Sequence, residues 1–254
     1  MTDCIWCKKT TQKIAEEHII PDALGCPANL VLTKGEVCQA CNNGLAHLDQ
    51  AVADEFDMIA FNENIPRKGG RPPVVLGRGN VVGTQGPEGS VMSFNMEKHS
   101  VKAHDGTTIG GYGKSARNIK ARFKRLGPFA TISGEFEFGQ GPKFLRGISK
   151  IALASFAYYL GADSALSPTF DAVRLFVREG QGVRPVISKN AIGMDRRVNT
   201  PMKLDTGEYV ALFSILGVDF FVDLSPNMTA LPEIEQMMLQ QYGEDGWTTI
   251  VAAT

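Results

Sequence analysis

Cys4-Ile5-Trp6-Cys7 and Cys38-Gln39-Ala40-Cys41 decide the fold of the N-terminal part of this 254-residue chain. Each stretch holds two thiols with two residues between them, and 30 residues separate the two pairs. Four thiolates in two such pairs suit the closed tetrahedral coordination of zinc. The alternative is four reduced core cysteines with accidental spacing, while Cys26 is expected to be a small buried residue or a spare thiol. We therefore predict a structural Zn²⁺ bound by Cys4, Cys7, Cys38 and Cys41.

The residues around the cysteine pairs predict two short strands followed by a helix. Strand-like stretches cover residues 14–20 and 30–37, with Pro21 and Gly25 between them. After Cys41, apolar residues recur at spacings of three and four, which is typical of an amphipathic helix. These residues are Leu45, Leu48, Val52, Phe56 and Ile59.

A family resemblance is carried by the residues between and after the cysteine pairs. Glu16-Glu17-His18-Ile19-Ile20-Pro21 lies between the pairs, and Asn42-Asn43-Gly44 follows the second pair directly. The order of CxxC, EHIIP, Asn29 ahead of a short strand, and CxxCN resembles the HNH endonucleases. The resemblance implies a ββα-metal fold with treble-clef zinc ligation.

The resemblance also implies a role for each matching residue. His18 corresponds to the general base that takes a proton from the attacking water, a role for which a neutral imidazole is suited. Glu17 and Asn42 correspond to the two protein ligands of a catalytic divalent cation. Their oxygen atoms are donors appropriate for Mg²⁺ or Mn²⁺. Asn29 corresponds to the asparagine that braces the hairpin and helps to orient the base.

The chain departs from the commonest HNH pattern, and these departures leave alternatives open. It has Glu where Asp is frequent, and it lacks the usual final His directly after the second cysteine pair. Asn43 and His47, four residues apart on one helix face, form an alternative or additional ligand pair, and Asp49 is a further candidate. Asn42 and Asn43 could instead cap the helix, and His18 could be a satisfied interior histidine.

The chain is expected to continue into a second domain. Residues 65–73, Ile-Pro-Arg-Lys-Gly-Gly-Arg-Pro-Pro, combine helix breakers with positive charge and predict a linker. We therefore expect an α+β protein in which residues 1–64 form the HNH module and residues 74–254 form a mixed α/β domain for substrate recognition or regulation. The elements predicted after the linker are strands within 74–112 and at 132–138, helices at 144–160 and 232–242, and a hairpin over 209–224.

The charge is distributed unevenly along the chain. Residues 1–64 carry four Lys and Arg against ten Asp and Glu, whereas the remainder carries 22 against 17. A nucleic acid would therefore be contacted mainly by the second part. Residues 114–125 contain six cations and no acid, and they predict a basic amphipathic helix that contacts phosphates or forms a solvated face. The six are Lys114, Arg117, Lys120, Arg122, Lys124 and Arg125. The positive surface is expected to extend to Arg146, Lys150, Arg174, Arg178 and Arg184.

Together these features predict a metal-dependent endonuclease of the restriction or defence type, which hydrolyses duplex DNA and leaves 5′-phosphate and 3′-hydroxyl ends. A homodimer is expected, because each HNH centre cuts one strand. The alternatives are a non-catalytic zinc treble clef that binds nucleic acid or protein, and the same chemistry on RNA or single strands. The sequence has no run of about 18 apolar residues and no signal peptide, so we expect a cytoplasmic protein without a membrane partner.

Overall fold

The computed structural model describes residues 3–10, 13–56, 59–60, 65, 138–139 and 141–252 with their side chains, and the backbone of the strands between residues 74 and 135. The chain divides into two compact units. The first unit combines Met1–Phe56 with Gly139–Thr254, and the second is Asp57–Phe138. This division differs from the expected one, in which residues 1–64 stood apart from 74–254. The reason is that the residues after Gly139 pack directly on the N-terminal module.

A ββα arrangement opens the first unit. β1 (Glu17–His18) pairs antiparallel with β2 (Val31–Leu32), with η1 (Asp22–Leu24) between them. α1 (Gln39–Glu55) follows, so the predicted order of two strands and a helix is confirmed. The helix begins earlier than predicted, because the Cys38 sulfur accepts a hydrogen bond from the Cys41 backbone N–H and thereby caps its first turn.

An antiparallel sheet forms the C-terminal part of the first unit. Its strand order is β11-β13-β14-β10-β15, with β12 beside β13. The predicted hairpin is confirmed, and its turn consists of Leu216 and Gly217, both with positive φ, as in the two-residue turns that match strand twist. The strands are β10 (Val186–Asn190), β11 (Arg196–Val198), β12 (Met202–Lys203), β13 (Tyr209–Ile215), β14 (Val218–Asp223) and β15 (Thr248–Ile250).

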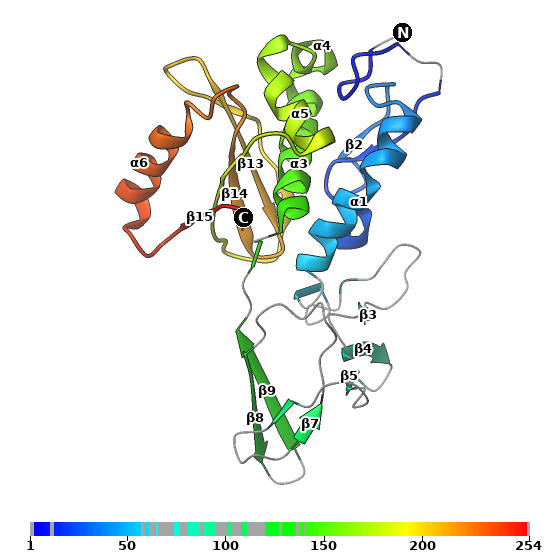
Figure 1. Cartoon of the computed structure of the whole chain (residues 1–254), viewed down its shortest axis with the longest axis vertical. Coiled ribbons are helices and arrows are strands. Elements are labelled where there is room, and N and C mark those ends of the chain that lie inside the picture. The colour runs from blue at the N-terminus through cyan, green and yellow to red at the C-terminus, as the bar shows by residue number, and fades with distance from the viewer. Residues whose placement is uncertain are drawn as a thin grey trace. The chain divides into compact units, whose positions relative to one another are not determined.

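α3 (Pro142–Leu160) is the central helix of the first unit and lies between the sheet and α1 (Figure 1). Most residues in its middle are buried, as expected for a helix that is covered on two sides. Its end at Gly161 is as predicted. α6 (Leu231–Tyr242), also predicted, packs on the sheet away from α3 (Figure 1). The remaining elements of this unit are α4 (Ala162–Ala165), η3 (Pro168–Phe170) and α5 (Asp171–Glu179). None of the helices in the described ranges is both long and apolar enough to cross a bilayer.

Aromatic side chains from distant parts of the sequence share one core in the first unit. Phe56, directly after α1, lies with its ring centroid 6.3 Å from that of Phe220 on β14. Phe144 of α3 lies 6.2 Å from the same ring. All three side chains are buried. The N-terminal module and the C-terminal sheet are therefore parts of one hydrophobic core.

The second unit is described by its strands. β3 (Val74–Leu76), β4 (Val81–Gly86) and β5 (Gly89–Phe94) form one antiparallel sheet. β6 (Val101–Lys102) pairs with β7 (Thr108–Gly110), and β8 (Lys120–Leu126) pairs with β9 (Phe129–Glu135). The predicted strands within 74–112 are thus confirmed, and the strand predicted at 132–138 begins and ends three residues earlier.

The predicted basic helix is wrong over Lys120–Leu126, which forms strand β8. This stretch also alternates between charged and apolar residues, a strand period that competes with the helical spacing. Lys114 and Arg117 lie outside the described residues, as does the predicted linker apart from Ile65.

α3 approaches α1 closely at Gly147. A Cβ atom at this position would lie 2.5 Å from Val52 Cγ2 and 2.9 Å from the Leu48 carbonyl oxygen. The second of these is a backbone atom of α1, which cannot move away without shifting the helix. A glycine is therefore required for this helix contact.

We expect Gly147→Ala to lower the free energy of unfolding by about 1–3 kcal/mol, the usual cost of overpacking a core. The clash outweighs the gain of about 1 kcal/mol that alanine normally brings to a helix. Denaturant unfolding measures the change. Gly44→Ala in α1 is the matched control, because nothing lies within 4 Å of its added Cβ. If the two variants are equally stable, the close helix contact is absent in solution.

Candidate functional site

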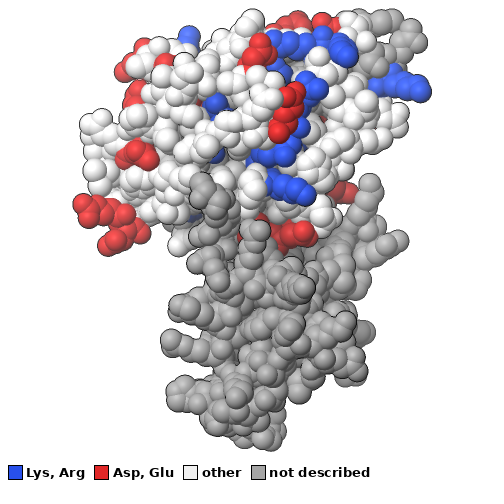
Figure 2. Space-filling model, viewed as in Figure 1, with Lys and Arg blue, Asp and Glu red and all other residues white. Residues whose placement is uncertain are grey.

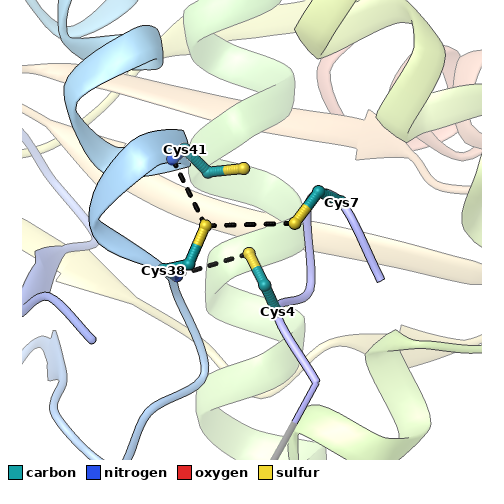
Figure 3. Close-up of side chains that lie close together, drawn as sticks. All are labelled: Cys4, Cys7, Cys38 and Cys41. Carbon is teal, nitrogen blue, oxygen red and sulfur yellow. Dashed lines mark hydrogen bonds between the residues drawn. The ribbon is translucent and has the colours of Figure 1, made fainter. Parts of the chain in front are cut away.

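The four paired cysteines come together in one cluster. Cys4 and Cys7 lie on the N-terminal segment, Cys38 and Cys41 lie at the start of α1, and the four side chains face a common centre (Figure 3). Their sulfur atoms all lie within 4.8 Å of one another, and Cys7 Sγ is 3.9 Å from Cys38 Sγ. Tetrahedral zinc with bonds of about 2.3 Å needs sulfurs about 3.8 Å apart. The cluster therefore fits zinc.

The thiols of this cluster interact strongly with one another. A hydrogen bond with the Cys41 side chain lowers the pKa of Cys4 to about 4, and the same contact raises the pKa of Cys41. The Cys38 backbone N–H also donates to Cys4 Sγ at 3.4 Å. Sulfurs held this close favour a shared cation, which stabilises all four as thiolates. Cys26 lies outside the cluster, with its sulfur 3.4 Å from the Leu30 carbonyl oxygen.

His18 and Glu17 lie next to each other on β1 but in different surroundings. Consecutive strand residues point to opposite faces, so one side chain can meet solvent while its neighbour is buried. The His18 side chain is 35% exposed, and its Nδ1 lies 3.7 Å from Asp22 Oδ1. Glu17 is 1% exposed. His18 is therefore accessible to water, whereas the Glu17 carboxylate is enclosed.

The first turn of α1 contacts Glu16, the residue directly before β1. Asn42 Nδ2 donates to the Glu16 backbone carbonyl at 3.1 Å. The N-cap of α1 is Cys38, so Asn42 and Asn43 do not cap this helix. Asn42, directly after the second cysteine pair, thus contacts the residue that precedes β1.

The other predicted site residues lie at the surface. Asn43 and His47 are exposed on α1, and His47 Nδ1 is 2.9 Å from the Gly44 carbonyl oxygen. Asn29 is exposed in the turn before β2, which the Leu30 N–H to Pro27 carbonyl bond closes. Within the described residues, no hydrogen bond joins Asn29 or His47 to Glu17, His18 or Asn42.

The Glu17 carboxylate is part of a buried charge cluster. Lys150 of α3 is 1% exposed, and its ammonium contacts Glu17 Oε1. The same ammonium donates to both carboxylate oxygens of Asp49 on α1, at 2.7 and 2.9 Å. Both Glu17 carboxylate oxygens are buried, and neither has a hydrogen-bond partner among the described residues, although Oε1 forms the ion pair with Lys150. We call Glu17, Asp49 and Lys150 the Lys150 triad.

In the Lys150 triad two carboxylates share one ammonium. This arrangement shifts the pKa values of Lys150 and Glu17. Burial acts to lower the pKa of Lys150, but the charges of Glu17 and Asp49 outweigh burial and raise it, so the ammonium stays charged. Burial raises the pKa of Glu17, and the Asp49 charge adds to this effect, while Lys150 opposes it. With both carboxylates ionised, the triad would carry one excess negative charge, which a proton or a further cation would offset.

The positive surface expected after residue 140 is smaller than predicted. Lys150, Arg174 and Arg184 are buried and bind carboxylates or backbone carbonyls within the first unit. Arg146 donates to the Val177 carbonyl at the end of α5, while Arg178 is exposed. On the face shown in Figure 2, several Lys and Arg form a band over α3 and α5 with carboxylates beside it, and others lie apart from the band.

Sequence reasoning missed the role of Lys150, which it grouped with surface cations. A signal was present, because Lys150 stands between Ile148 and Ile151 on a helix whose neighbouring positions are apolar. Asp22, close to the imidazole, was missed because nothing in the sequence indicates that η1 turns it back toward β1.

Comparison with known families decides what this module is. Residues 4–57 match the model of the HNH endonuclease family. The predicted resemblance is confirmed, and the match covers both cysteine pairs, β1, β2 and α1. It supports a nuclease-type function and, with it, binding of nucleic acid. The chain matches neither a curated protein nor a solved structure. The HNH assignment therefore applies to the N-terminal module.

We expect Cys41→Ser to abolish stoichiometric zinc binding and to destabilise the HNH module, because structural zinc contributes about 10 kcal/mol or more to such folds. Metal analysis of the purified protein and thermal unfolding measure the two effects. Cys26→Ser is the matched control, since its sulfur lies outside the cluster, and it should retain one zinc per chain. Full zinc occupancy in Cys41→Ser would contradict the four-cysteine site.

Proposed function

We propose that this protein is a metal-dependent endonuclease that hydrolyses phosphodiester bonds in duplex DNA, in a restriction or defence role. The observation that carries the proposal is the placement of His18. It lies partly exposed on β1 of a module that matches the HNH family, directly after Glu17 in the sequence. A base that activates water needs this access to solvent.

His18 would accept the proton of the attacking water. Asp22, near Nδ1, would orient the imidazole so that Nε2 is presented to that water. Asn29 would brace the turn before β2. The products would carry 5′-phosphate and 3′-hydroxyl ends.

Glu17 and Asn42 are the proposed ligands of a catalytic Mg²⁺ or Mn²⁺, with Asn43 and His47 as an alternative or additional pair. The unpartnered Oε2 of Glu17 and the excess negative charge of the Lys150 triad are suited to a hard divalent cation. When bound, such a cation supplies charge stabilisation to the leaving 3′ oxygen. Phosphate and water would complete its coordination.

Substrate contacts are proposed to come mainly from outside the HNH module, which has more acids than bases. The predicted phosphate-binding cations of the second unit are Lys114, Arg117, Lys120, Arg122, Lys124 and Arg125. A homodimer would place two HNH centres on the two strands of one duplex. The cytoplasm, where DNA is accessible, is the proposed location.

We expect His18→Ala to lower the rate of supercoiled plasmid cleavage by about 10²- to 10⁴-fold, the usual contribution of a general base. The assay compares both proteins in Mg²⁺, Mn²⁺ and EDTA, and EDTA should stop cleavage by the wild type. Equal cleavage by His18→Ala and wild type would refute the assigned base.

A panel of duplex DNA, single-stranded DNA and RNA identifies the substrate in the same assay. If folded, zinc-loaded wild type cleaves none of them, a non-catalytic treble clef that binds nucleic acid or protein replaces the nuclease proposal. If only RNA or single strands are cut, the chemistry stands and the substrate changes.

We expect Glu17→Gln to lower cleavage at least tenfold and to raise the Mn²⁺ concentration needed for half-maximal rate, because an amide is a weaker ligand than a carboxylate. The protein should remain folded, since Lys150 keeps its two bonds to Asp49. Glu16→Gln changes the adjacent, exposed carboxylate and is the matched control. Equal Mn²⁺ requirements in the two variants would remove Glu17 from the metal site.

A further inference from the structure

The Lys150 triad joins the three elements that surround the candidate centre. Glu17 belongs to β1, which also carries His18, and Asp49 belongs to α1, which also carries Asn42. Lys150 comes from α3, outside the residues that match the HNH family. The buried ammonium is therefore a contact that the HNH module receives from the rest of the chain.

The geometry of the triad limits where the Glu17 carboxylate can lie. Oε1 is in contact with the Lys150 ammonium, and Oε2 has no hydrogen-bond partner among the described residues. Lys150 itself is fixed by two bonds to Asp49 and by the close approach of α3 to α1 at Gly147, one helical turn earlier. One oxygen of Glu17 is thus held, while the other is left for a ligand.

We propose that Lys150 is a positioning residue of the nuclease centre, which holds Glu17 Oε1 so that Oε2 is presented to the catalytic cation. This inference rests on the proposed function of Glu17 as a metal ligand. Lys150 does not touch substrate or metal in this arrangement. It acts through Glu17 alone.

Removing the ammonium has two opposing consequences, and these distinguish positioning from general stabilisation. Without Lys150, Glu17 and Asp49 are two uncompensated carboxylates that attract a divalent cation more strongly. That cation would bind between the two carboxylates instead of at Glu17 Oε2 alone. Metal affinity should rise while the rate of cleavage falls.

The test is Lys150→Met in the full chain, with plasmid cleavage measured over a range of Mn²⁺ concentrations. We expect the half-maximal Mn²⁺ concentration to fall at least tenfold and the rate at saturating Mn²⁺ to fall at least tenfold. A saturating rate within twofold of wild type overturns the proposal, as does an unchanged or raised Mn²⁺ requirement. Zinc content and circular dichroism establish that the variant is folded.

Arg184→Met is the matched control, because it removes another buried cation from the first unit. Arg184 is 4% exposed and binds the carbonyls of Asp223 and Ser225 rather than the candidate centre. Its cleavage rate should fall only in proportion to any loss of folded protein. Its Mn²⁺ requirement should equal that of the wild type. If Arg184→Met and Lys150→Met change the Mn²⁺ requirement and the saturating rate equally, Lys150 has only a structural role, and the proposal is overturned.

Asp49→Asn provides a second variant if Lys150→Met fails to fold. Asp49 is 27% exposed, and its loss leaves one ammonium for one carboxylate, so Lys150 binds Glu17 more tightly. We expect the Mn²⁺ requirement to rise, opposite to the change in Lys150→Met. An unchanged or lowered requirement overturns the proposal.

Mn²⁺ binding without DNA separates this inference from the nuclease proposal. Titration calorimetry should show at least tenfold tighter Mn²⁺ binding by Lys150→Met than by wild type, whether or not the wild type cleaves. Tighter binding without wild-type cleavage supports control of the Glu17 metal site by Lys150 and rejects the nuclease. Wild-type cleavage with unchanged Mn²⁺ affinity in the variant retains the nuclease and rejects the positioning role.

Discussion

The charge of the buried Lys150 ammonium must be compensated inside the protein. The ion pairs that do so connect β1, α1 and α3 of the first unit. A lone ammonium at this depth would lose its hydration without replacement, so it needs carboxylates within bonding distance. Those carboxylates come from β1 and α1, while the lysine comes from α3. Removing one partner of such a group typically costs about 3–5 kcal/mol, because the remaining charge stays buried. The register of the three elements is therefore fixed by charge as well as by shape.

α1 and α3 are also tied by apolar contacts. Gly147 lets α3 approach α1 closely enough for Lys150 to reach Asp49 one turn later. Phe56 and Phe220 continue the contact toward the sheet. Lys8, just after the first cysteine pair, adds an ion pair to Asp171 of α5 at 2.6 Å. The HNH module is therefore embedded in its unit on the side that carries Glu17, and it is open on the side that carries His18.

What the sequence predicted well depends on local spacing. Two CxxC pairs predict the thiol cluster because ligand spacing is a local constraint, and the α3 and α6 helices and the β13–β14 hairpin are marked by periodicity and by Gly161 and Gly217. β8 was mistaken for a helix because its residues satisfy a period of two as well as one near 3.6. The unit boundary was misplaced because nothing local indicates that residues beyond Gly139 return to α1. Contacts between residues far apart in the sequence, such as Lys150 and Glu17, produce no local spacing pattern from which they could be predicted.

The thiol cluster and the Lys150 triad stabilise the module at different places, and they constrain the candidate centre in different ways. A zinc ion would fix the start of α1 against the N-terminal segment, and thereby the position of Asn42. The triad fixes β1 against the middle of α1, and thereby the position of Glu17. His18 lies on the strand between these two anchors. Residues 1–56 alone would keep the cysteines but lose the ammonium, which would leave Glu17 and Asp49 as two neighbouring uncompensated acids. The proposed centre therefore includes α3 as well as the residues that match the HNH family.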